Sequence, residues 1–164
     1  MELSRPFWDG SRHLSKTTYI DGNLCHLASR PAWSLTGECV NEAGRHLVFV
    51  VEDDGEVRAS TRALLEASGY AVREFASGED LIASGDAATA GCIVLDYNLS
   101  GMSGLDMLRS LRTQGIETPA IMVSGSGKQA IQAAAAAGIV AVLRKPLSAD
   151  ALEQWLEQVF SASR

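Results

Sequence analysis

Four short apolar runs follow one another from residue 46 onward, and each of them ends in charged or hydroxyl side chains. Runs of four to eight apolar residues bounded by turn residues are typical of buried strands. In open α/β sheets, ligand sites lie at the carboxyl ends of parallel strands, so these side chains are predicted to meet at one edge. The runs and the residues after them are 46–51 with Glu52-Asp53-Asp54, 91–95 with Asp96, 120–123 with Ser124-Gly125, and 139–143 with Arg144-Lys145-Pro146.

Segments with helical character separate these runs. An apolar stripe predicts a helix from Asp54 to Ser68, where Ser68-Gly69 ends it. Together with a short strand at 70–75, the pattern predicts five strands that alternate with five helices. This alternation predicts an α/β fold with a doubly wound, five-stranded parallel sheet. The other predicted helices are 78–83 with Ser77 as its N-cap, one from near Ser103 to near Gly115, an Ala-rich helix at 127–137, and a last helix capped by Ser148.

Residues 1–45 differ from the rest of the chain. They mix tryptophan, proline and glycine with polar residues, without a sustained period. We therefore predict an N-terminal extension, mostly irregular or disordered, before a domain over 46–162. The residues His13, Cys25, His26 and Cys39 match no zinc-site spacing, so we favour no metal site there.

Charge and hydropathy exclude some classes of function. The net charge is -6, and the acidic excess lies entirely in 46–164, which argues against a non-specific nucleic-acid surface. No segment reaches the roughly 18–20 consecutive apolar residues of a membrane span. The chain also begins without the features of a signal peptide. We expect a cytoplasmic protein that binds neither membrane nor nucleic acid directly.

The three carboxylates Glu52, Asp53 and Asp96 are predicted to share one pocket. Like charges this close are unfavourable unless a cation neutralises them, and oxygen ligands suit Mg²⁺ better than Zn²⁺. Asp96 is then free to act as a nucleophile toward phosphorus, since carboxylates form acyl-phosphate intermediates. Lys145 supplies a positive charge for a phosphoryl oxygen, and Ser124 supplies a hydroxyl.

Each of these residues also has a purely structural interpretation. The acidic run at 52–54 is compatible with a helix cap. Asp96 is compatible with a turn residue, Ser124 with a cap, and Lys145 with a solvated charge. The functional interpretation rests on all four occurring at strand ends in this order.

These segments together resemble the receiver domain of two-component response regulators, including the chemotaxis and nitrogen-fixation types. The resemblance covers residues 46–162 and implies the flavodoxin-like (βα)5 fold. It is carried by Val50-Val51-Glu52-Asp53-Asp54, by the stretch 95–104 (Leu-Asp-Tyr-Asn-Leu-Ser-Gly-Met-Ser-Gly), by Met122-Val123-Ser124-Gly125 and by Arg144-Lys145-Pro146.

The resemblance implies a role for each matching position. Asp96 is the phosphoacceptor, Asp53 a direct Mg²⁺ ligand, and Glu52 a ligand acting mainly through water. It further implies that the Asn98 backbone carbonyl is a third protein ligand and that Ser124 is the switch hydroxyl. Lys145 is implied to pair with the phosphoryl group, and the Lys145–Pro146 bond is implied to be cis. Asn98 and Ser126 are implied to tune dephosphorylation, and Asp54 to start a helix.

Two positions depart from the family pattern. Val142 stands where the family usually has an aromatic residue that rotates on activation, which puts the aromatic-coupled signal in doubt. Ser100 stands where the family often has proline, and we expect it to loosen the loop after Asp96. Neither departure removes a group needed for phosphorylation.

The predicted function is that of a stand-alone receiver, because the chain ends directly after the last predicted helix. The receiver takes a phosphoryl group from a histidine kinase or histidine phosphotransfer protein and signals to an unidentified downstream protein. It assists its own phosphorylation and dephosphorylation but is not otherwise an enzyme. The Ala-rich stretch 127–137 is compatible with close docking of a partner helix and equally with plain helix propensity.

Two alternatives stay open. One is a receiver-like interaction module that does not cycle phosphate, which Val142 favours. The other is an Mg²⁺-dependent phosphatase with an aspartyl nucleophile. Such enzymes usually have an acidic group two residues after the nucleophile, where this chain has Asn98, which cannot act as a general acid.

Overall fold

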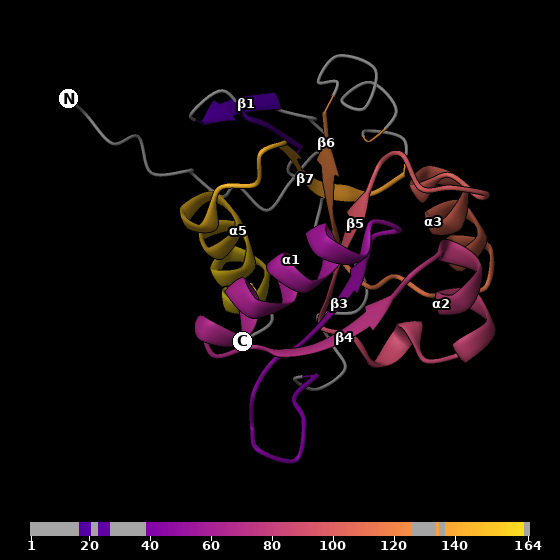
Figure 1. The fold of residues 1–164 in the computed structure, drawn as a ribbon, viewed down its shortest axis with the longest axis horizontal. Helices are drawn as coiled ribbons and strands as arrows, with labels where there is room; N and C mark the ends of the chain where they lie inside the picture. Colours follow the sequence, from indigo (N-terminus) through magenta and orange to yellow (C-terminus); the bar gives the residue numbers. More distant parts are fainter. Residues whose placement is uncertain (1–16, 21–22, 27–38, 126–133, 135–136, 163–164) are drawn as a thin grey trace, which may run out of the picture.

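Five parallel strands form the centre of the computed structural model, which describes residues 17–20, 23–26, 39–125, 134 and 137–162 (Figure 1). Their order in the sheet is β4-β3-β5-β6-β7. The predicted parallel α/β sheet is thereby confirmed. The strands are β3 (Leu47–Val51), β4 (Ala71–Phe75), β5 (Cys92–Asp96), β6 (Ala120–Ser124) and β7 (Ile139–Arg144).

Helices cover both faces of this sheet (Figure 1). Helices α1 and α5 pack on one face, and α2 and α3 on the other. No helix in the described part of the chain is long and apolar enough to cross a membrane. The helices are α1 (Gly55–Ala67), α2 (Gly78–Ser84), α3 (Gly104–Thr113) and α5 (Ala149–Ser161), and a 3-10 turn, η2 (Ala87–Thr89), precedes β5.

Side-chain caps start the four helices where the sequence predicts. The Asp54 carboxylate accepts from the backbone N–H groups of the first turn of α1. The hydroxyls of Ser77, Ser103 and Ser148 each accept one such bond at α2, α3 and α5. A cap satisfies donors that have no partner inside the helix, which is why these residues locate helix starts. The predicted helix 127–137 lies outside the described residues except for Ala134, which is helical and buried, and Ala137.

The strand order places two strand ends at the point where the direction of winding reverses. From β3 the chain adds β4 on one side, and then β5, β6 and β7 on the other. The crevice at such a reversal is where doubly wound sheets bind ligands. The register aligns Val51 with Leu95 and Asp96 with Val123. Residues that end β3 and β5 therefore lie side by side at one edge.

An antiparallel hairpin extends the sheet to seven strands. It consists of β1 (Thr17–Ile20) and β2 (Asn23–His26), and β2 pairs with β7 through Leu24 with Val142 and Cys25 with Ala141. These eight residues form strands within the extension 1–45, for which mostly irregular structure stays a prediction because the structure describes only part of it. Asp21-Gly22 separates the two strands in the sequence, and an Asp-Gly pair between short strands is a strong hairpin signal that we did not use.

Candidate functional site

Three carboxylates meet where β3 and β5 end. Glu52 and Asp53 follow β3, and Asp96 is the last residue of β5. One carboxylate oxygen from each residue lies within 4.8 Å of the other two. Glu52 and Asp96 are buried, whereas Asp53 is exposed. The predicted juxtaposition of the three acids is confirmed, and it follows from the alignment of adjacent parallel strands.

Lys145 closes this cluster from the end of β7. Its Nζ lies 3.2 Å from Glu52 Oε2 and 3.2 Å from Asp96 Oδ2. Partial burial acts to lower the pKa of Lys145, but hydrogen bonds and charge from the two carboxylates outweigh it and raise that pKa. Burial, followed by the nearby charge of Asp96, raises the pKa of Glu52. One ammonium therefore offsets the acidic cluster only in part.

Asp96 Oδ1 is the atom that indicates a missing partner. It is buried and has no hydrogen-bond donor among the described residues. Buried polar atoms in folded proteins almost always have a partner, so such an oxygen calls for a ligand or a cation. Oxygen donors from three carboxylates fit a hard divalent cation such as Mg²⁺. The residues present therefore fit the cation that the sequence predicts.

Ser100 holds the exposed carboxylate in place. Its backbone N–H and its hydroxyl both donate to Asp53 Oδ2, at 3.1 and 2.6 Å. These bonds, the hydroxyl bond foremost, lower the pKa of Asp53. We expected this serine to loosen the loop after Asp96, but these two bonds attach the loop to Asp53. Sequence reasoning missed the attachment because the two residues lie 47 positions apart.

The remaining predicted site residues lie around the cluster. Ser124 ends β6 and is fully buried, and its carbonyl accepts the Lys145 N–H at 3.0 Å. Asn98 is exposed in the loop after β5, and the role of its carbonyl stays a prediction. The predicted cis bond between Lys145 and Pro146 is confirmed. Ser126 lies outside the described residues, and Val142 is buried within β7.

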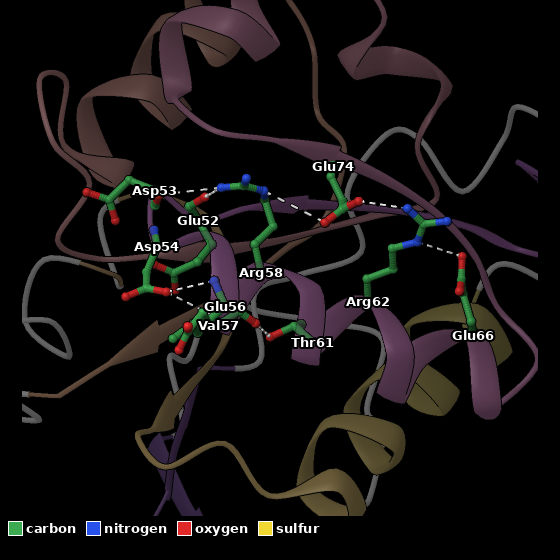
Figure 2. Close-up of polar contacts among 10 residues, drawn as sticks. All are labelled: Glu52, Asp53, Asp54, Glu56, Val57, Arg58, Thr61, Arg62, Glu66 and Glu74. Carbon is green, nitrogen blue, oxygen red and sulfur yellow. Dashed lines mark hydrogen bonds and ion pairs between the residues drawn. The ribbon is translucent and has the colours of Figure 1, made fainter.

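Arg58 supports the acidic loop, and sequence reasoning missed it. Its guanidinium donates to the backbone carbonyls of Glu52 at 2.7 Å and Asp53 at 3.4 Å. Figure 2 shows the same guanidinium reaching Glu74 of β4, with Nε 3.7 Å from Oε1. The residue lies one helical turn after the Asp54 cap, but a single sequence contains no signal that it turns back toward the loop. Arg58 thus links the loop after β3 to the neighbouring strand.

A cavity of about 420 Å³ adjoins the cluster on the α1 side. Its wall includes Val57 and Leu64 of α1 together with the loop residues Pro146 and Leu147. Asp96 and Lys145 also line the cavity. The phosphoacceptor candidate is therefore buried within the protein but borders an open space.

Comparison with known proteins agrees with this geometry. The model of the response regulator receiver domain family matches residues 48–157. The transcriptional regulatory protein FixJ of Azorhizobium caulinodans is 39% identical over 80 residues, covering 49% of this chain and 38% of that protein. The C4-dicarboxylate transport transcriptional regulatory protein DctD of Rhizobium meliloti is 34% identical over 112 residues, covering 65% of this chain and 24% of that protein. The chain thus spans less than half the length of either relative.

The same fold occurs among solved structures. Chemotaxis protein CheY4 of Vibrio cholerae superposes with a TM-score of 0.65 and 26% identity, covering 70% of this chain and 98% of that protein. The parallel sheet and its covering helices are therefore those of a receiver, whereas β1 and β2 lie outside the segment that the family model matches.

Proposed function

The chain belongs to the response regulator receiver domain family, and we propose that it accepts a phosphoryl group on Asp96 from a phosphohistidine. The donor would be a histidine kinase or a histidine phosphotransfer protein. One observation carries the proposal: buried Asp96 has no donor to Oδ1 among the described residues and lies beside two further carboxylates and the Lys145 ammonium. This arrangement combines a nucleophile, a cation site and a fixed positive charge.

Mg²⁺ is the cation that we assign to this site. Asp53 and Asp96 would hold it directly, Glu52 mainly through water, and the Asn98 backbone carbonyl would complete the protein ligands. When bound, the ion neutralises carboxylate and phosphoryl charge. Two observations support this assignment: Asp96 Oδ1 has no hydrogen-bond donor in the described part of the chain, and the charge around Lys145 is only partly balanced.

The proposed transfer moves one phosphoryl group between two protein side chains. A carboxylate oxygen of Asp96 attacks the phosphorus, and the phosphorus–nitrogen bond of the phosphohistidine breaks. The imidazole nitrogen keeps the electron pair of that bond, and Asp96 becomes an acyl phosphate. Lys145 would exchange its contact with Asp96 for one with a phosphoryl oxygen, and the Ser124 hydroxyl would donate to another.

The signal would pass through the strands that carry these two residues. The hydrogen bond between the Lys145 N–H and the Ser124 carbonyl joins the ends of β6 and β7. A shift of either side chain toward the phosphoryl group therefore acts on both strands. The proposed recipient of the signal is a downstream protein of unidentified kind. We place the protein in the cytoplasm and propose that it binds protein partners, without direct contact with nucleic acid or membrane. We do not assign an enzymatic activity beyond the protein's own phosphorylation cycle.

Intact-mass measurement tests the proposal directly. The full chain is incubated with Mg²⁺ and a small-molecule phosphodonor, in parallel with Asp96→Asn, which keeps the side-chain size. We expect a labile gain of one phosphoryl group in the wild type only. No gain in a wild type that binds Mg²⁺ would contradict the proposal and favour the non-cycling interaction module. An equal gain in Asp96→Asn would assign the phosphoryl group to another residue.

A further inference from the structure

Ser100 contributes more to the site than its exposed position in a loop indicates. Building on the proposed function, we propose that Ser100 is a positioning residue for the cation: its amide and hydroxyl hold Asp53 and the loop after β5 in the geometry that Mg²⁺ requires. This role belongs to serine at this position and would be lost with proline.

The contacts join the loop after β5 to the carboxylate that follows β3. Ser100 N and Oγ lie 3.1 and 2.6 Å from Asp53 Oδ2. Both residues are exposed at the end of the sheet. An exposed aspartate without such bonds would sample several rotamers. The conformational entropy lost when a cation orders that side chain would weaken cation binding. Two bonds to one oxygen fix the carboxylate before the cation arrives.

The contacts leave acceptor capacity for the cation. An ionised carboxylate has about four lone-pair sites, and Ser100 uses two of them, both on Oδ2. Oδ1 of Asp53 is not engaged by Ser100. The serine therefore acts as an outer partner of a ligand, and such partners orient the ligands that touch a metal.

The same loop is held at a second point. Glu79, in the first turn of α2, accepts the Met102 N–H through Oε1 at 2.9 Å. Gly101, between Ser100 and Met102, has a φ of 84°, a conformation that favours glycine. The loop that contains Asn98 is thus attached to Asp53 on one side and to α2 on the other. Loss of the Ser100 contacts would release the side nearest the proposed cation ligands.

A graded set of substitutions separates the two donors. Ser100→Thr keeps the hydroxyl and the N–H, and Ser100→Ala keeps only the N–H. Ser100→Pro removes both donors, because proline has neither a hydroxyl nor a backbone N–H. Ser110→Ala is a matched control, since its hydroxyl lies on α3 against Gln114 and away from the cluster.

The test is calorimetric titration of the full-length proteins with MgCl₂, with thermal melting to establish that each variant is folded. We expect the dissociation constant for Mg²⁺ to rise about tenfold in Ser100→Ala and further in Ser100→Pro, within the range of about 10–100-fold seen for outer partners of metal ligands. Ser100→Thr and Ser110→Ala should bind like the wild type. Amide hydrogen exchange without Mg²⁺ should show faster exchange around residue 100 in Ser100→Ala.

Each result has a distinct meaning. Equal or tighter Mg²⁺ binding by Ser100→Ala, beside a wild type that binds, would overturn the role of Ser100 and leave the proposed function intact. A wild type that does not bind Mg²⁺, or an Asp53→Asn variant that binds equally well, would overturn the cation assignment and this inference with it.

Discussion

Replacement of Gly104 by alanine should disturb the fold at the base of the phosphoacceptor. Gly104 is the first residue of α3 and packs directly under the end of β5. An added Cβ would lie 2.5 Å from the Asp96 backbone oxygen and 2.5 Å from Leu95 Cδ1. Real Cβ atoms do not approach so closely, so the strand or the helix must shift. Because one of the two contacts is with backbone, a change of rotamer cannot relieve it.

Gly55 provides a matched control for this substitution. It is the first residue of α1, directly after the N-cap, as Gly104 is in α3. Neither glycine has a positive φ, and a Cβ on Gly55 would meet only Arg58 Nη2 at 3.7 Å. Gly55→Ala therefore measures the effect of a lower conformational entropy of the unfolded chain, without the steric clash.

The expected magnitudes follow from the two contacts. Overpacking of a tight site typically destabilises by about 1–3 kcal/mol. The lower entropy of the unfolded chain after a glycine-to-alanine change stabilises by about 0.4–1 kcal/mol at a compatible site. We expect Gly104→Ala to lower the free energy of unfolding by about 1–2 kcal/mol and Gly55→Ala to leave it equal or raise it.

Urea denaturation followed by circular dichroism measures both changes, and the intact-mass assay measures their effect on phosphorylation. Gly104→Ala should also slow phosphorylation, because the shifted atom belongs to the phosphoacceptor residue. Equal stability and equal phosphorylation of the two variants would refute the reasoning from the close approach of α3 to β5.

Three further outcomes are expected. Asp54→Ala should lower the free energy of unfolding, measured by urea denaturation, by about 1 kcal/mol, because the first turn of α1 loses its side-chain cap. Unchanged stability would show that water replaces the cap. Without Mg²⁺, Glu52→Gln should become more stable relative to the wild type as the pH rises from below about 4.3 to neutrality, because the pKa of Glu52 is raised in the fold and its ionisation therefore destabilises the wild type. Denaturation curves whose stability difference does not change with pH would contradict this. Removal of residues 1–38 should accelerate hydrogen exchange in β7 but not in β5, because β7 is the strand of the parallel sheet that borders β2. Equal protection of β7 in both proteins would contradict the pairing.

Local patterns in the sequence account for most of the fold. The length of the apolar runs, and the polar residues that end them, predicted the parallel strands. Asp54, Ser77 and Ser148 predicted where helices start. These signals act over a few residues, so they can be found without knowing what packs against them. The hairpin at 17–26 also had a local signal, Asp21-Gly22, but its pairing with β7 joins segments more than 100 residues apart.

The composition of the acidic cluster was likewise predictable, because parallel strands bring their carboxyl ends to one edge. The contacts between individual atoms of the cluster could not be predicted from the sequence. Side-chain directions in the assembled fold decide the two bonds from Ser100 to Asp53 and the contact of Arg58 with the loop after β3. They also decide the burial of Asp96 Oδ1, which has no donor among the residues that the structure describes. The sequence alone determined which chemical groups reach the end of the sheet, since strand period and polarity are local. Only the tertiary structure decided how those groups are held, because their partners come from distant parts of the chain.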